Sequence, residues 1–293
     1  MRRFAFIQYD VFTSRPLEGN QLAVFTDARG LSDEEMQALA REMNLSETTF
    51  VLPADAEQER EHGIRVRIFT VGEELPFAGH PTLGTGFYLH ERDKKDVVEL
   101  NLNVGKIPVT FTKESNGEVR GEMRQRDPEF GQIHSRDAVA RAMGVSVGEL
   151  DSELPIQTVS TGMPFAIVPV RSLETMQNLR IDWNRCAEYL ATTDAKFFYF
   201  VSRETTDRSR DLHARMIFYN GEDPATGSAG GCYAAWAVAH GVVASDQRAI
   251  IEQGIEMNRA SLLYFRATKS GDRAVNVRVG GSTVKVMAGE VYL

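Results

Sequence analysis

Three titratable side chains, Glu47, His80 and Asp223, stand in motifs that could carry acid–base chemistry. Glu47 lies in residues 44–50, between a predicted helix end and an apolar strand, where a carboxylate is costly to bury without a partner. Such surroundings raise the pKa of a carboxyl and suit it to general acid–base catalysis. The alternative is an edge residue that faces water.

The other two titratable residues stand at the predicted starts of helices. Residues 79–82 (Gly-His-Pro-Thr) and 223–228 (Asp-Pro-Ala-Thr-Gly-Ser) both combine small residues, hydroxyls and free backbone N–H groups. Unpaired N–H groups and the positive end of the helix dipole favour a bound anion. Ordinary helix capping is the alternative. If the two helix starts face each other across an interdomain cleft, this geometry would suit a small carboxylate substrate.

An internal repeat supports this pairing of motifs. Residues 19–25 (GNQLAVF) match residues 162–168 (GMPFAIV) at an offset of 143. Residues 80–86 (HPTLGTG) match residues 223–229 (DPATGSA) at the same offset. Two matches at one offset predict two homologous halves.

Hydrophobic patterning predicts the elements that must position these residues. In the first half a capping box at Ser32 opens a helix that ends near Asn44, and a second helix runs from Pro81 to about Glu91. In the second half one helix follows Asp182 and a long one opens near Pro224. Strands are predicted at residues 4–12, 22–26, 48–52, 64–70, 97–102, 107–112, 119–123, 156–160, 165–170, 197–202, 212–218, 249–252, 262–267, 275–279 and 284–293.

The fold class follows from this pattern. Each half is expected to be an α+β domain with a mostly antiparallel sheet and one very apolar, small-residue helix. A helix that is hydrophobic all round must be wrapped by sheet or packed centrally.

Composition excludes several classes of function. The chain has 293 residues, with 33 Lys and Arg against 41 Asp and Glu, so its net charge is −8. This excess of acidic residues argues against a protein that coats nucleic acid or an anionic membrane. Two isolated cysteines make neither a disulfide scaffold nor a zinc site, and they favour a cytoplasmic setting. The six dispersed histidines support no metal site, and neither a phosphate-binding loop nor a membrane span is found.

The motifs together resemble the phenazine-biosynthesis PhzF family, which has the diaminopimelate-epimerase-like fold. The resemblance rests on residues 10–12 with 19–20, 46–48, 77–85 and 222–229, in the family's order. It implies two pseudo-symmetric domains, each a barrel-like sheet around a central helix. It also implies a last strand that returns to the first domain, a homodimer and no cofactor. We therefore expect one domain at residues 1–128 plus 280–293 and the other at 129–279.

The resemblance also assigns roles to residues. It places the acid/base on Glu47, a histidine on His80, an aspartate on Asp223 and an anion-binding pair on Gly227 and Ser228; Ser46 and Gly79 are further expected substrate contacts. Neither helix-start motif holds a cysteine, which excludes the two-thiol mechanism of the epimerases. One departure lies at residues 253–261 (QGIEMNRAS), where Ala260 replaces a proline and Asn258 a glycine.

With these roles, we predict that Glu47, His80 and Asp223 converge on one interdomain pocket. Three functions follow as expectations. The first is an isomerase that shifts a proton between carbons of a small carboxylic acid, with Glu47 as the acid/base on one face. The second is an epimerase that uses two non-thiol acid/bases, Glu47 opposed by Asp223. The third is a binding protein that kept the fold and lost turnover.

Overall fold

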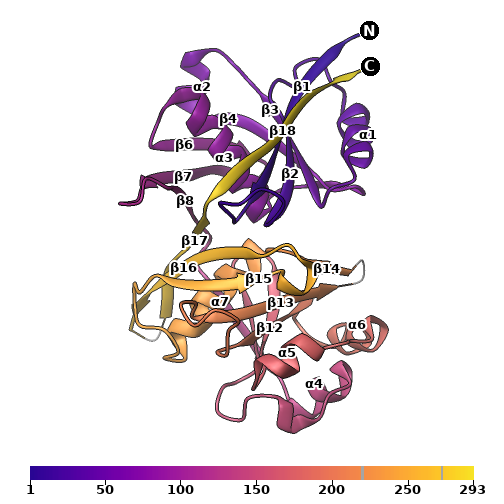
Figure 1. The fold of residues 1–293 in the computed structure, drawn as a ribbon, viewed down its shortest axis with the longest axis vertical. Helices are drawn as coiled ribbons and strands as arrows, with labels where there is room; N and C mark the ends of the chain where they lie inside the picture. The colour runs from indigo at the N-terminus through magenta and orange to yellow at the C-terminus, as the bar shows by residue number, and fades with distance from the viewer. Residues whose placement is uncertain (219–220, 272) are drawn as a thin grey trace. The chain divides into compact units, whose positions relative to one another are not determined.

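The computed structural model describes residues 1–218, 221–271 and 273–293. Internal contacts divide the chain into two compact units. Unit 1 comprises Met1–Arg124 with Gly280–Leu293, and unit 2 comprises Gln125–Val279. Figure 1 shows both, with the chain coloured from its N-terminus to its C-terminus.

Unit 1 holds three helices and nine strands among the described residues. Its helices are α1 (Asp33–Met43), α2 (Ala56–His62) and α3 (Gly79–Asp93). Its strands are β1 (Arg3–Val11), β2 (Asn20–Phe25), β3 (Glu47–Leu52), β4 (Ile64–Phe69), β5 (Glu74–Leu75), β6 (Val97–Leu102), β7 (Gly105–Lys113), β8 (Val119–Arg124) and β18 (Thr283–Tyr292).

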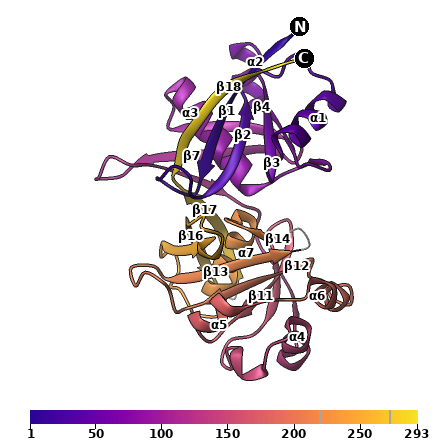
Figure 2. The same cartoon turned by 45° about the vertical axis from the view of Figure 1, so that its right-hand side comes forward.

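Unit 2 contains the remaining described elements. Its α-helices are α4 (Arg136–Met143), α5 (Leu173–Asn178), α6 (Trp183–Leu190) and α7 (Gly227–Ala239), with 3₁₀ turns at Val147–Glu149 and Ile255–Met257. Its strands are β9 (Glu129–Ile133), β10 (Gln157–Ser160), β11 (Pro164–Pro169), β12 (Phe197–Ser202), β13 (Leu212–Phe218), β14 (Gly221–Asp223), β15 (Ala249–Gln253), β16 (Ser261–Ser270) and β17 (Arg273–Gly281), whose last two residues belong to unit 1. Helices α4 and α6 lie next to each other (Figure 2).

The same series of strand pairings occurs in both units. In unit 1, β1-β2-β3-β4-β6-β7 pair in the order antiparallel, parallel, antiparallel, parallel, antiparallel. In unit 2, β10-β11-β12-β13-β15-β16 pair in the same order of directions. Each unit also has a short hairpin, β4–β5 or β13–β14, just before its most buried helix.

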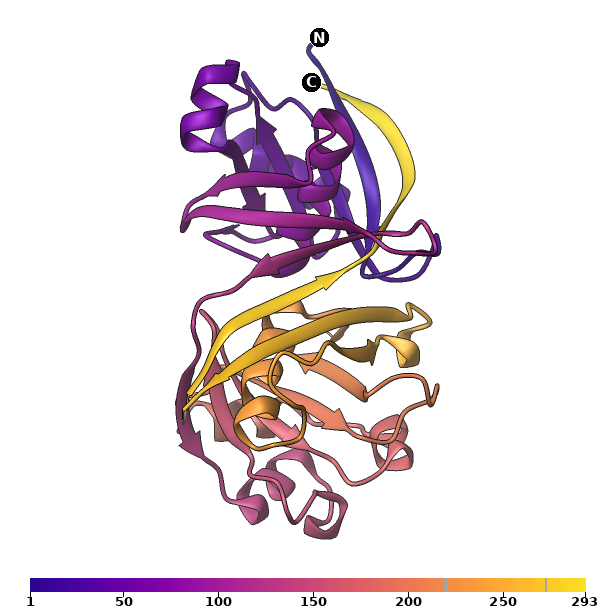
Figure 3. The same ribbon diagram turned by 90° about the vertical axis from the view of Figure 1, so that its left-hand side faces the viewer.

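The chain's last strand completes unit 1. β18 pairs antiparallel with β1 along its length, from Arg3 opposite Tyr292 to Val11 opposite Thr283. Arg2 and Leu293 exchange two backbone hydrogen bonds of 2.6 and 3.0 Å, which places the two chain ends side by side (Figure 3). The last strand of the chain thus pairs with its first strand.

The apolar helices are buried as their composition predicts. All residues of α7 except Ser228 and Ala239 are buried, and α7 packs against β10, β11 and β16. Helix α3 contacts β1, β2, β3, β6, β7 and β8. A Cβ at Gly84 would lie 2.6 Å from Leu22 Cδ2 and 2.8 Å from Val11 Cγ2, so only glycine lets α3 approach these strands so closely.

One sequence-based match is wrong in register. His80 is the second residue of α3, whereas Asp223 ends β14, four residues before α7 begins. The two helix starts, Gly79 and Gly227, are 148 residues apart rather than 143. The structural counterpart of His80 is therefore Ser228, because the segment between the earlier match and the helix differs in length in the two halves.

Candidate active site

Glu47 and His80 come together within unit 1. Glu47 opens β3, which pairs in parallel with β2, and His80 lies in the first turn of α3. His80 Nε2 is 3.5 Å from Glu47 Oε2, and the two side chains are 6% and 16% exposed. Two of the three predicted titratable residues thus form a contact that is shielded from most solvent.

The imidazole of His80 is neutral at physiological pH. Burial lowers its pKa to about 3, and a hydrogen bond with the backbone of Gln21 opposes this shift only in part. The Nδ1 atom lies 3.4 Å from the side-chain amide nitrogen of Asn20. The Nε2 atom is buried and makes no hydrogen bond within the described residues. The contact with Glu47 therefore joins a neutral ring to a carboxyl group and is not an ion pair.

The remaining unit 1 candidates are placed differently. Gly79 is the first residue of α3 and is buried, and Ala78 before it provides no side-chain cap. Ser46 lies in the loop that enters β3 and is exposed. Asn20 is 1% exposed and opens β2 next to His80. Asn20 belongs to one of the motifs in the sequence, but the motif did not predict a place for it in the site.

Asp223 lies in a hydrogen-bonded cluster within unit 2. Its Oδ2 accepts a hydrogen bond of 2.6 Å from the hydroxyl of Thr226. Its backbone carbonyl accepts one of 2.8 Å from the side-chain amide of Gln253. The same amide also donates to Thr226 Oγ1 at 3.0 Å. Asp223 is thus held by groups that belong to the entry of α7.

Gln253 on β15 fixes the entry of α7, a role that no sequence motif predicted. Its side chain is fully buried, and its Oε1 accepts hydrogen bonds from Tyr199 Oη at 3.0 Å and from Thr226 N at 3.3 Å. Burial raises the pKa of Tyr199 well above its usual value, so the phenol remains a donor. A glutamine that ends an apolar strand is the sequence signal for such a buried polar hub.

Gly227 and Ser228 are the first two residues of α7. The N-cap residue of α7, Thr226, makes no side-chain cap, and its hydroxyl donates to Asp223. Helix α1 differs, because Ser32 and Glu35 form a capping box there. The backbone N–H groups in the first turn of a helix are a favourable place for an anion.

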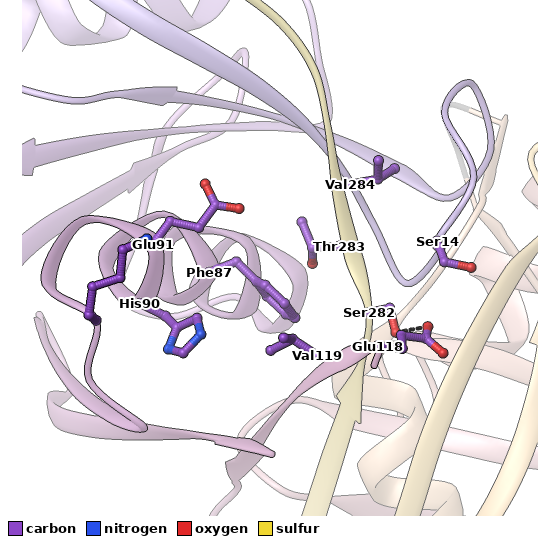
Figure 4. Close-up of a pocket in the computed structure, with 10 residues that line it drawn as sticks. Ser14, Phe87, His90, Glu91, Glu118, Val119, Ser282, Thr283 and Val284 are labelled. Atoms are coloured by element: carbon purple, nitrogen blue, oxygen red, sulfur yellow. Dashed lines mark hydrogen bonds between the residues drawn. The ribbon is translucent and has the colours of Figure 1, made fainter. Parts of the chain in front are cut away.

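The cavity shown in Figure 4 is separate from these residues. It has a volume of about 250 Å³ in unit 1, and none of the predicted site residues lines it. Three of its polar side chains have partners: Glu118 accepts from Ser282, Glu91 from Tyr9, and His90 contacts the Lys95 carbonyl. The buried hydroxyl of Thr283 makes no hydrogen bond within the described residues.

The described residues contain no cluster of three or more His, Cys, Asp or Glu that could hold a metal ion. Unit 1 thus holds a carboxyl next to a neutral imidazole, and unit 2 holds a second carboxyl near the start of a helix. A carboxyl shielded from solvent is suited to proton transfer.

The chain has a mixed α/β, sheet-rich fold that solved structures of other proteins share. A probable proline racemase from Agrobacterium radiobacter has this fold, with a TM-score of 0.63 at 12% identity over 99% of this chain and 93% of its own. The family model described as phenazine biosynthesis-like protein matches residues 9–289. The chain belongs to this PhzF family.

The alignments with named relatives cover nearly the whole chain. The trans-2,3-dihydro-3-hydroxyanthranilate isomerase of Pseudomonas aeruginosa is 34% identical, with 100% of each sequence covered. An uncharacterized isomerase of Mesorhizobium japonicum is 35% identical over 98% of both. The solved phenazine biosynthesis protein of the PhzF family from Bacillus anthracis has a TM-score of 0.89 and 30% identity, with both chains fully covered.

Proposed function

We propose that this protein is a cofactor-independent isomerase that shifts a proton between two carbons of a small cyclic carboxylic acid. The observation that carries the proposal is the shielded contact between Glu47 and the neutral ring of His80. The names of the Pseudomonas aeruginosa and Mesorhizobium japonicum relatives support the isomerase class.

In this proposal Glu47 takes a proton from one carbon of the substrate and returns it to another on the same face. The neutral ring of His80 orients the carboxyl and exchanges no charge with it. General acid–base help of this kind contributes about 10²- to 10⁴-fold to a rate.

The unit 2 residues bind and orient the polar groups of the substrate. The backbone N–H groups of Gly227 and Ser228 bind the substrate carboxylate, and Asp223 orients a neighbouring amino or hydroxyl group. Gly79 and Ser46 provide further contacts. The hydrogen bonds from Thr226 and Gln253 support this role, because they fix Asp223 before any substrate binds.

We further propose that the two units are copies of one epimerase-like fold, each a mostly antiparallel sheet around a central helix. The matching series of strand pairings supports this. The expected domains, 1–128 with 280–293 and 129–279, stay a proposal; the compact units divide at Arg124 and Val279.

Turnover of trans-2,3-dihydro-3-hydroxyanthranilate tests the proposal. The wild-type protein should convert it, and Glu47→Gln should lose at least about 100-fold in kcat, because the amide keeps the shape but cannot carry the proton. Glu42→Gln, at an exposed position on α1, is the matched control and should retain full activity. Full turnover by Glu47→Gln would refute the assignment.

A further inference from the structure

The same arginine–glutamate pair occurs in both units. In unit 1, Arg67 Nε and Nη2 donate to the two carboxylate oxygens of Glu74 at 2.8 and 2.5 Å. In unit 2, Arg215 Nε and Nη2 donate to the two oxygens of Glu222 at 2.8 and 2.7 Å. Each pair joins residues seven apart, and the two pairs stand 148 residues apart, the offset that separates the two helix starts.

Each pair ties the same three elements together. The arginine lies on β4 or β13 and the glutamate on the short strand β5 or β14. Arg67 also pairs with Asp33 in the first turn of α1, and Arg215 donates to the carbonyls of Met176 and Leu179 at α5. Helices α1 and α5 both belong to the crossovers that connect parallel strands, β2 to β3 and β11 to β12. The repeated arginine thus bonds a crossover helix in both units, at the start of α1 in unit 1 and at the end of α5 in unit 2.

The glutamate leads directly into the candidate site in both units. Glu74 is five residues before Gly79, where α3 begins, and Glu222 is five residues before Gly227, where α7 begins. A proline follows each glutamate by two residues. Glu222 is also the immediate neighbour of Asp223. Each pair therefore stabilises a hairpin that directly precedes one of the two helix starts.

The energetics favour a geometric role for the pair. The side chains of Arg215 and Glu222 are 5% and 13% exposed, and those of Arg67 and Glu74 are 15% and 24% exposed. A shielded ion pair often adds little stability over apolar residues of similar volume, since desolvation offsets the attraction. A bidentate arginine–carboxylate pair does fix the relative orientation of the two strands that carry the arginine and the glutamate.

We propose that Arg67 with Glu74 and Arg215 with Glu222 are positioning residues, which hold the first turns of α3 and α7 in the geometry that the reaction needs. This inference rests on the proposed function, since it names what the two pairs position. Neither pair touches the substrate. They act through the hairpins β4–β5 and β13–β14.

The test compares Arg67→Lys and Arg215→Lys with the control Arg120→Lys. Lysine keeps the charge but cannot make the two-pronged bond. Arg120 bonds Glu114 at 3.1 Å in unit 1, and these two side chains are 18% and 24% exposed, close to the Arg67 pair, but they lie on the β7–β8 hairpin. With trans-2,3-dihydro-3-hydroxyanthranilate as the probe, we expect kcat to fall about 10-fold or more in the first two variants, with little change in KM. Arg120→Lys should keep the wild-type kcat.

Amide hydrogen exchange of the free protein provides a readout that needs no turnover. Exchange at residues 76–82 should accelerate in Arg67→Lys, and exchange at 224–230 in Arg215→Lys. If the wild-type protein does not turn over the probe, the proposed function fails. The hydrogen-exchange rates at these residues still test whether the arginine–glutamate pairs are positioning residues. Folded lysine variants with wild-type exchange at these residues would overturn the inference, as would a wild-type kcat where the probe is turned over.

A second pair of variants covers the case in which lysine prevents folding. Arg67→Met with Glu74→Leu, and Arg215→Met with Glu222→Leu, replace each ion pair by apolar residues of similar volume and should keep the thermal stability. We expect the same loss of kcat and the same local increase in exchange in these double variants. Wild-type exchange and kcat in both would show that the pairs position nothing.

Discussion

His80 links the chemistry of the site to a pH dependence that can be measured. Its pKa of about 3 in the folded protein lies below the usual value near 6.5, because burial disfavours the imidazolium. Protonation therefore favours unfolding, so the stability that depends on neutral His80 is complete above about pH 6.5 and is lost as the pH falls toward 3.

Urea unfolding of the wild type and His80→Gln checks this prediction. Between pH 6.5 and 4.5 the wild type should lose up to about 1.4 kcal/mol per pH unit more than the variant, which has no imidazole to protonate. Parallel stability curves for the two proteins would contradict a buried neutral His80.

His213 predicts a dependence of the opposite sign. It is fully buried on β13, with Nδ1 2.9 Å from Glu252 and Nε2 2.9 Å from Glu256. Burial alone would lower its pKa, but the hydrogen bonds to the two carboxylates outweigh burial and raise the pKa to about 9. The stability that His213 contributes is then complete below about pH 6.5 and is lost as the pH rises through 9.

The measurement is again urea unfolding, now of the wild type and His213→Gln at pH 7 and pH 10. The wild type should lose about 3 kcal/mol more than the variant over this range. An equal loss in the two proteins would show that the imidazolium is not stabilised by Glu252 and Glu256.

At the scale of elements, the entry of α7 depends on a close backbone approach. Gly254 follows β15 with a φ of +77°, and a Cβ there would lie 2.6 Å from the Pro224 carbonyl oxygen and 2.5 Å from that of Arg259. Gly30 has a similar φ of +87°, but no heavy atom lies within 4 Å of its would-be Cβ. An alanine would be strained by the positive φ at either position, but only at Gly254 would it also meet neighbouring backbone.

We expect Gly254→Ala to reduce the free energy of unfolding by about 2 kcal/mol more than Gly30→Ala, since only the first substitution must displace backbone next to Asp223. Thermal or urea unfolding of both variants measures the difference. Equal losses would mean that the contact between Gly254 and the Pro224 segment is not tight.

Local signals explain which elements could be predicted from the sequence. The capping box at Ser32 and the stop at Asn44 involve contacts within one helix, and both are present in the structure. The strands at 197–202 and 212–218 have the predicted bounds. The first is an apolar run, and the second alternates His213 and Arg215 with apolar residues. The short elements α2, α5 and β14 lack such a pattern and were not predicted.

Tertiary contacts explain what could not be predicted in the site. The contact between Glu47 and His80 joins residues 33 apart, and only the family resemblance pointed to the two together. The roles of Asn20 and Gln253 depend on which buried polar atoms they meet. The wrong match of His80 to Asp223 arose because short motifs were aligned without the strands that precede them.

At the scale of the whole molecule, the repeat concerns folding topology as well as sequence. Both units use the same five pairings, the same hairpin and the same arginine–glutamate pair before a buried helix. No helix within the described ranges is both long and apolar enough to cross a bilayer.

The family resemblance predicts a homodimer, and the molar mass in solution tests this directly. The chain has a mass of 32.7 kDa. Light scattering coupled to size-exclusion chromatography should give twice this value over the micromolar range. A mass equal to that of one chain at all concentrations would contradict the dimer.

The central claim is that Glu47 carries a proton between two carbons of the substrate. The most direct measurement follows trans-2,3-dihydro-3-hydroxyanthranilate in deuterated water by NMR, with the wild type and Glu47→Gln. The wild type should move the unsaturation and deliver a proton or deuteron to a new carbon, and Glu47→Gln should do so at least about 100-fold more slowly. Transfer at the wild-type rate by Glu47→Gln, or inversion of a stereocentre by the wild type without movement of the unsaturation, would contradict the account.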